Sequence, residues 1–84
     1  MARYRIAFAG QAEVARRKMT GLRRREFDTA MSSTIGTNPY GHGSTAIRGA
    51  KDRREATVAG AFVVYYVAGA ALTITAVKLI DHSL

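Results

Sequence analysis

The stretch ATVAGAFVVYYVAGAALTITAV, residues 56 to 77, holds 22 consecutive residues without a charged side chain and is the main evidence for the predicted fold. At about 1.5 Å of rise per residue, a helix of this length spans roughly 33 Å, close to the thickness of a bilayer's hydrocarbon core. In lipid a helix satisfies its own backbone hydrogen bonds, so one segment can cross without a partner strand. The stretch therefore predicts a single transmembrane helix, which we place over residues 56–80.

Charge is segregated along the chain. Residues 1 to 55 hold twelve of the thirteen basic residues and five of the six acids, a net charge of +7. Because positive charge flanking a span stays on the inner side, the N-terminus is predicted on that side, which is the mitochondrial matrix, the cytoplasm or the stroma according to the organelle. The short tail, residues 81–84, is then expected on the opposite face, which is the intermembrane space in a mitochondrion. The chain has no cysteine, which excludes disulfides and thiolate metal sites.

The predicted fold class is all-α, without an independent globular core, because a chain this short has little else to surround the span. A charged helical stub over residues 45–55 is expected to run into the membrane without a break. Residues 32–44 are rich in Gly, Ser and Thr and predict an extended loop. Residues 1–31 are predicted as a basic amphipathic segment, with apolar residues at helical spacing: Phe8, Ala12, Ala15, Met19 and Leu22.

Basic side chains before the span are the predicted contacts to anionic lipid such as cardiolipin, or to acidic protein surfaces. They are Arg16, Arg17, Lys18, Arg23, Arg24, Arg25, Arg53 and Arg54. The same charge could neutralise nucleic-acid phosphates. The region shows no recognisable nucleic-acid-binding motif, however, so no nucleic acid is expected as a partner.

Small residues and two tyrosines within the predicted span indicate close packing against other helices. A phenol hydroxyl at mid-membrane needs a hydrogen-bond partner, which a neighbouring helix could supply. The predicted packing residues are Gly60, Gly69, Thr73, Ala76, Tyr65 and Tyr66.

The sequence indicates no catalytic site. Neither His42 nor His82 has a second ligand at metal-binding spacing, and the acids before the span lie among arginines, which favours ion pairing over acid catalysis. We therefore predict that the protein is not an enzyme and that it has no metal, no cofactor and no small-molecule substrate.

The overall layout resembles that of small supernumerary subunits of mitochondrial inner-membrane complexes. The resemblance rests on the architecture of the whole chain and on no specific motif. It implies a non-catalytic accessory subunit of an electron-transport complex, which supports the other membrane subunits of a large assembly and binds lipid. Three alternatives stay open: an accessory subunit of the ATP synthase membrane region, a stand-alone single-pass regulator, and a membrane-tethered nucleic-acid binder.

Overall fold

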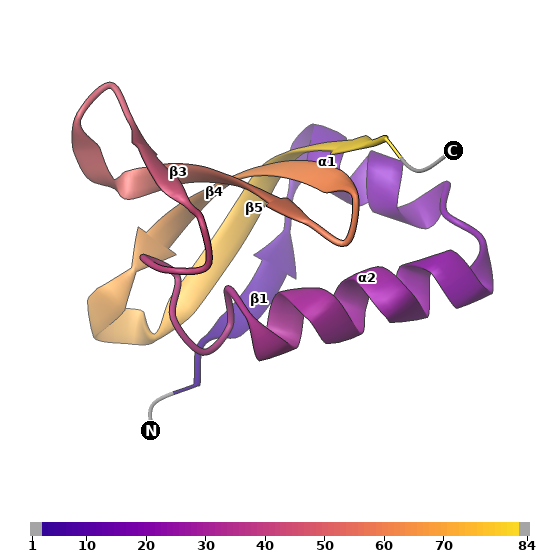
Figure 1. The fold of residues 1–84 in the computed structure, drawn as a ribbon, viewed down its shortest axis with the longest axis horizontal. Helices are drawn as coiled ribbons and strands as arrows, with labels where there is room; N and C mark the ends of the chain where they lie inside the picture. The colour runs from indigo at the N-terminus through magenta and orange to yellow at the C-terminus, as the bar shows by residue number, and fades with distance from the viewer. Residues whose placement is uncertain (1–2, 83–84) are drawn as a thin grey trace.

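The computed structural model describes residues 3–82, and strands occupy the segment for which the sequence predicts a membrane helix (Figure 1). Along the chain the elements are β1 (Arg5–Phe8), α1 (Gly10–Arg17), α2 (Gly21–Ser33), β2 (Thr45–Ile47), β3 (Ala50–Val58), β4 (Ala61–Ala68), the short 3-10 turn η1 (Gly69–Ala71) and β5 (Thr73–Asp81). The fold is mixed α/β, so the prediction of an all-α fold is wrong.

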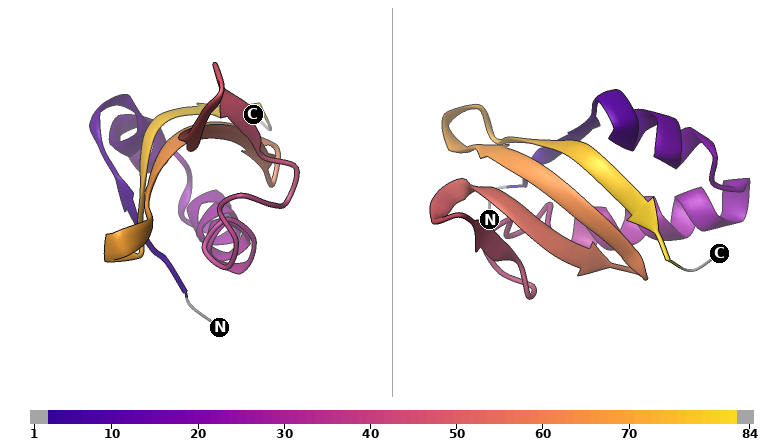
Figure 2. Two further views of the ribbon diagram at one scale, coloured as in Figure 1. Left: turned by 90° about the vertical axis from the view of Figure 1, so that its left-hand side faces the viewer. Right: turned by 90° about the horizontal axis from the view of Figure 1, so that it is seen from above.

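The strands form one twisted sheet in the order β1-β5-β4-β3-β2. The four strands from β2 to β5 pair antiparallel with their neighbours, and β1 pairs parallel with β5 at the far edge. Figure 2 shows the sheet curving over α2, which lies against one face. The strand order therefore leaves β1 and β2 as the two edges.

The predicted membrane helix is wrong because glycine-containing turns divide its apolar stretch into pieces of strand length. Ala59 and Gly60 both have positive φ, 49° and 81°, and join Val58 to Ala61 as a two-residue hairpin turn. The residues between the turns are largely β-branched or aromatic, which favours strands. Among residues 3–82, no helix has both the length and the apolarity that a membrane crossing requires.

The neighbouring predictions also need correction. The charged stub, residues 45–55, forms β2, a turn at Arg48 and Gly49, and the start of β3 rather than a helix. The single amphipathic helix of the N-terminal segment is instead a strand followed by two helices. Of the predicted tail, Asp81 ends β5, while residues 83 and 84, like residues 1 and 2, lie outside the described part of the chain.

The core lies between the sheet and the helices, contrary to the prediction that no globular core forms. Alternate residues of β4 are buried toward the helices, and Phe27 and Met31 of α2 meet them from the other side. The fully buried side chains include Phe27, Met31, Ile35, Val63, Tyr65, Ile74 and Leu79. Burying each large apolar side chain contributes about 1.5–3 kcal/mol, which is how a chain of 84 residues stabilises a fold without a disulfide.

One side chain extends the sheet's hydrogen bonding where β1 stops. The Gln11 amide of α1 donates to the Leu79 carbonyl at 2.9 Å and accepts from the Leu79 backbone N–H at 2.8 Å. It thereby takes the place of a strand at this edge of β5. This contact fixes α1 beside β5. Within residues 3–82, no helix covers the opposite face of the sheet.

Candidate functional site

The side of the sheet that faces away from the helices, here called the open face, carries the polar and aromatic residues of the strands. Because side chains alternate along a strand, the residues between the buried positions of β3, β4 and β5 point to this side. Its members are Arg5, Arg53, Glu55, Thr57, Phe62, Val64, Tyr66, Thr75, Lys78 and Ile80.

Strand register arranges these side chains in rows across the open face. Arg53 pairs with Tyr66, and Tyr66 pairs with Thr75, so these three side chains form one row. In the next row, Val64 lies between Glu55 and Lys78. Such paired residues lie close enough to contact the same ligand. The open face therefore presents a strip in which a ring, cations and hydrogen-bonding groups alternate.

Tyr66 is the most exposed aromatic side chain on this face, with 43% of its surface accessible. The Arg53 guanidinium lies over its ring, 5.6 Å from the ring centre. A cation above one side of an aromatic ring is favourable, and here it is partly solvated. The pair offers both a flat apolar surface and a nearby positive charge.

The β2–β3 hairpin projects beyond the sheet on the side opposite α2 and adds charge next to the open face (Figures 1 and 2). Its turn consists of Arg48 and Gly49, both with positive φ, 53° and 76°. Arginine is rarely found in this left-handed conformation, which asparagine or glycine adopts at lower energy. The exposed Arg48 is therefore held at the hairpin tip despite its backbone strain.

The hairpin is braced by the loop that precedes it. The Arg54 guanidinium donates to Ser44 Oγ at 3.0 Å and to the Ser44 carbonyl at 3.2 Å. The Tyr40 hydroxyl donates to the Asp52 carboxylate at 2.7 Å, and this hydrogen bond raises the pKa of Tyr40 to about 12. Since Lys51 and Arg54 also stack on the Tyr40 ring, the hairpin has a defined position relative to the open face.

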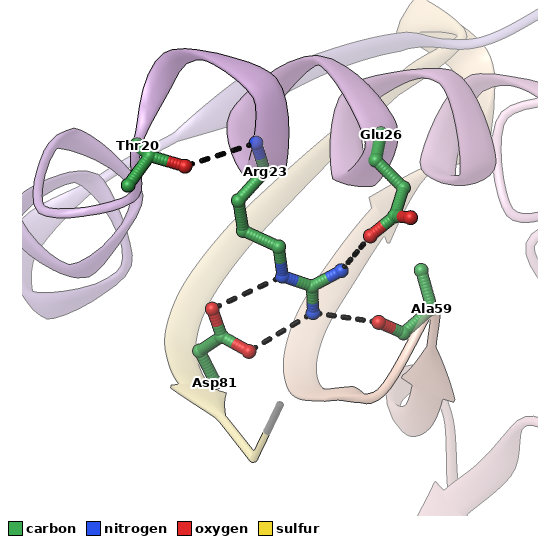
Figure 3. A network of polar contacts seen from close by, with 5 residues as sticks. All are labelled: Thr20, Arg23, Glu26, Ala59 and Asp81. Carbon is green, nitrogen blue, oxygen red and sulfur yellow. Dashed lines mark hydrogen bonds and ion pairs between the residues drawn. The ribbon is translucent and has the colours of Figure 1, made fainter. Parts of the chain in front are cut away.

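Arg23 is predicted from the sequence as a lipid or partner contact. In the structure it instead binds groups from other parts of the fold (Figure 3). Its guanidinium donates to both Asp81 carboxylate oxygens, at 3.1 and 2.9 Å, and to the Ala59 carbonyl at 2.6 Å. It also forms an ion pair with Glu26, one turn along α2. These bonds to Asp81 raise the pKa of Arg23 and join α2 to the β3–β4 turn and the end of β5.

Other predicted contact arginines are also engaged within the protein. Arg16 pairs with Asp28 across the two helices, and Arg17 pairs with Glu13. Arg24 donates to the Arg17 carbonyl at the end of α1 and to the Met19 carbonyl in the linker that follows, both at 3.0 Å. For Lys18 and Arg25, both exposed, no partner is found within residues 3–82. Of the predicted set, the structure brings only Arg53 to the open face, while Arg54 supports the adjoining hairpin.

The predicted helix-packing residues lie in strands and turns, so a role in helix packing no longer applies to them. Gly60 is in the β3–β4 turn and Gly69 is in η1. Thr73 and Ala76 belong to β5, where Ala76 is fully buried. Tyr65 is also fully buried, and its hydroxyl donates to the Pro39 carbonyl at 2.6 Å. Only Tyr66 of this set is a prominent part of the candidate site.

Sequence reasoning missed Arg5, Arg48, Glu55, Thr75 and Lys78. The available signal was the alternation of the strands: in AFVVYYVA the buried residues fall at every second position. A period of two residues places consecutive side chains on opposite faces, so it puts Tyr66 on the face opposite Tyr65. The one-residue spacing between Arg53 and Glu55 would have placed both of them on a single face.

The open face carries three cations, Arg5, Arg53 and Lys78, and one carboxylate, Glu55. This mixture suits an anionic ligand with flat rings, because the cations neutralise charge while Tyr66 supplies a stacking surface. Within residues 3–82 no group of three or more His, Asp or Glu side chains could hold a metal ion. The prediction that the protein is not an enzyme is not carried forward, because Glu55 and Lys78 are groups that can transfer protons.

No protein-family model matches the chain, and no curated protein sequence matches it. Solved structures share its fold, and two of them are described here. One is the toxin-antitoxin complex RelBE2 from Mycobacterium tuberculosis, with a TM-score of 0.80 and 12% identity over 100% of this chain and 97% of that chain. The other is the free state of a mutant toxin RelE from E. coli, with a TM-score of 0.70 and 17% identity over 96% of this chain and 85% of that chain.

These findings correct the functional predictions. A fold shared with toxin-antitoxin proteins, and the lack of any spanning helix within residues 3–82, overturn the assignment as an accessory subunit of a respiratory complex. Three further predictions depended on that span and are also wrong. They are the membrane-subunit partners, the lipid contacts and the location in the mitochondrial inner membrane. The expectation that no nucleic acid is a partner rested on the lack of a recognisable binding motif in the basic region, and it is not carried forward.

Proposed function

We propose that this protein is the toxin of a toxin–antitoxin pair and that its open face binds single-stranded RNA. The observation that carries the proposal is the fold: it matches the M. tuberculosis toxin-antitoxin structure along the full chain, and it matches the E. coli toxin along nearly all of it. At these identities the likeness concerns the backbone, so the argument for RNA is made from this chain's own side chains.

The Arg53–Tyr66 pair supports binding of a single strand. A base stacked on an aromatic ring contributes about 1–3 kcal/mol, and every base has a face that can stack. Arg53 lies over the Tyr66 ring, where its charge can reach the phosphate next to a stacked base. We infer that one base occupies the free surface of Tyr66 and that Arg53 binds the adjoining backbone.

Phosphates on either side of that base have further cations to contact. Lys78 lies one row away on β5, and Arg5 lies at the β1 edge. Arg48 projects from the braced hairpin on the other side. The cations therefore extend from one edge of the open face to the other, as a bound strand requires.

Polar groups of the open face favour RNA over DNA. The Thr75 hydroxyl lies in the same row as Tyr66, and the Glu55 carboxylate lies in the adjoining row. Either oxygen can accept a hydrogen bond from a ribose 2′-hydroxyl, which DNA does not have. A DNA strand of the same sequence is therefore expected to bind more weakly.

The same groups supply a chemical route for cleavage. Glu55 would take the proton of a 2′-hydroxyl, whose oxygen would attack the adjacent phosphorus and release the 5′-oxygen to form a 2′,3′-cyclic phosphate. Lys78, in the same row, would give the leaving oxygen its proton. Replacement of Glu55 by Gln should abolish cleavage and leave RNA binding intact or slightly stronger, because it removes the one described carboxylate of the face.

Expression of the chain in E. coli from a tightly controlled promoter tests the proposed toxicity. Induction should arrest growth, and the double variant Arg53→Ala/Tyr66→Ala should relieve the arrest at equal protein level. The matched control is Lys18→Ala/Arg25→Ala, which removes two exposed cations elsewhere and should leave the arrest unchanged. No arrest, or equal relief by both double variants, would contradict the role of the open face.

A further inference from the structure

The last part of β5, residues 77–81, extends past the end of β1. β1 pairs with residues 73–76 of β5, whereas β4 stays paired with β5 as far as Asp81. Residues 77–81 therefore form an edge of the sheet, and this edge carries Lys78 and Ile80 of the open face. A segment that is paired on one side only opens more easily unless another group holds its outer side.

A β-bulge at Val77 determines which face of the sheet Lys78 reaches. On β4, Tyr65 pairs with Ala76 and the preceding Val64 pairs with Lys78, so β5 has one extra residue between them. Ala76 is fully buried. In an unbroken strand Lys78, two residues later, would point to the same buried side. The extra residue reverses this direction and exposes Lys78 on the open face, which is a common use of bulges next to active sites.

The Gln11 side chain of α1 holds the outer side of this edge at the residue after Lys78. Its amide donates to the Leu79 carbonyl at 2.9 Å and accepts from the Leu79 N–H at 2.8 Å. One planar amide thus binds both backbone groups of a single residue, as a neighbouring strand would. Because consecutive residues of a strand direct their backbone groups to opposite sides, those of Lys78 point toward β4.

The contact of Gln11 differs from the other polar contact to this segment. Arg23 binds the side chain of Asp81, three residues beyond Lys78, and so holds the end of β5. Gln11 acts instead on the backbone directly beside Lys78. Since Gln11 is exposed, its contribution comes from the two hydrogen bonds and not from burial of apolar surface.

We propose that Gln11 is a positioning residue for RNA cleavage, which holds the bulged segment of β5 so that Lys78 stays in one row with Glu55. The proposal rests on the proposed function for the role of Lys78 as the proton donor. Lysine carries its charge on a flexible chain of four carbons, so the backbone position sets the region that the amine can reach. Because a displacement of about 1 Å can cost about 100-fold in rate, loss of the Gln11 contact should slow the chemical step.

Amide hydrogen exchange of the free protein, measured by NMR, tests whether Gln11 holds the segment. Gln11→Met keeps the length of the side chain and removes both hydrogen bonds. Exchange at the Leu79 and Lys78 amides should become at least about tenfold faster, while Ile74, which is paired with β1, should not change. The control Val14→Ala, at an exposed position of the same helix, should leave all three amides unchanged. Faster exchange at Leu79 alone would overturn the proposal, because Gln11 would then protect one amide without holding Lys78.

Single-turnover cleavage of a labelled single-stranded RNA, with protein in excess, separates positioning from a general loss of structure. Gln11→Met should lower the maximal rate about tenfold and leave the protein concentration at half-maximal rate within about twofold. A smaller folded fraction would instead raise that concentration and leave the maximal rate unchanged, which would overturn the proposal. Val14→Ala should match the wild type in both quantities.

A double-mutant cycle identifies the residue through which Gln11 acts. In the Lys78→Ala background, Gln11→Met should change the residual rate by no more than about twofold, because the group that it positions is gone. Losses that multiply would show that Gln11 acts elsewhere, and full activity of Lys78→Ala would refute the role of Lys78 and the proposal with it. If the wild type does not cleave RNA, the proposed function fails, and the exchange measurement still decides whether Gln11 holds Lys78 in place.

Discussion

Tyr65 and Tyr66 are consecutive residues of β4, yet they belong to two regions with different physical demands. Tyr65 points toward the helices, is fully buried and donates its hydroxyl to Pro39; burial raises its pKa. Tyr66 points to the open face, where 43% of it is exposed beneath Arg53. The helix-covered face holds the fold together, and the open face is left available for a ligand. Mutations on the two faces should therefore affect different measurements.

The largest expected difference comes from truncating these two residues. Tyr65→Ala should lower the free energy of unfolding by about 3–5 kcal/mol, because it leaves a large cavity in the core. Tyr66→Ala should change it by about 1 kcal/mol or less. Urea denaturation followed by circular dichroism measures both. Similar losses for the two variants would contradict the assignment of the faces.

The Arg23 network should come next in effect. Arg23→Ala removes the hydrogen bonds to Asp81 and Ala59 and should lower the free energy of unfolding by about 2 kcal/mol. The control is Arg25→Ala on the same helix, which is exposed and should stay within about 0.5 kcal/mol. Equal stability of the two variants in thermal denaturation would show that the network contributes little.

The affinity for RNA should depend on residues of the open face. Arg53→Ala and Tyr66→Ala should each weaken single-stranded RNA about 10- to 100-fold, from the loss of a charge contact or of base stacking. Fluorescence anisotropy with a labelled oligonucleotide measures this, and Arg25→Ala should bind like the wild type. A loss as large in Arg25→Ala would indicate non-specific attraction by net charge.

Salt dependence provides a smaller but more specific signal. The logarithm of the RNA affinity should fall linearly with the logarithm of salt concentration, with a slope that decreases by about 0.7 for each phosphate contact removed. Lys78→Ala is expected to lower the slope by about that amount. Tyr66→Phe should leave the slope unchanged, because stacking does not release counterions.

The smallest effect concerns pH and the loop that braces the hairpin. Because its folded-state pKa is raised to about 12, Tyr40 contributes stability that is complete below pH 10 and is lost as pH rises through about 12. Asp52→Asn should reduce this loss, since the carboxylate is the main cause of the shift. Thermal denaturation between pH 9 and pH 12 measures the difference, and identical curves would rule out the Tyr40–Asp52 contribution.

Much of the sequence-based prediction failed at a single step. Residues 56–80 were interpreted as one long helix, whereas they form the end of β3 and the strands β4 and β5. The absence of charge from residue 56 to residue 77 is compatible with a span, but it arises because β4 and β5 are central strands with a buried face. Gly60 and Gly69 were interpreted as helix-packing residues, whereas the structure uses them at the two hairpin turns. The nine-residue spacing of Gly60 and Gly69, which is about the length of one strand, is the feature that distinguishes the two cases.

The basic residues were predicted to contact anionic lipid or acidic protein surfaces. In the structure some of them bind groups within the fold, and others are exposed. Arg16, Arg23 and Arg24 find acids or carbonyls within the fold, which no local pattern could show, because Asp81 lies 58 residues from Arg23. Arg53 does reach the open face, as a strand residue beside Tyr66. Helix content in the N-terminal third was expected from the apolar spacing, but the break between α1 and α2 was not.

An NMR titration of the labelled protein with a single-stranded RNA tests whether the open face of the sheet is the RNA-binding surface. We expect the chemical-shift changes to concentrate at Arg53, Tyr66, Thr75 and Lys78, with little change on α1 and α2. Changes centred on the exposed helix residues Lys18 and Arg25, or no changes at all, would contradict the claim.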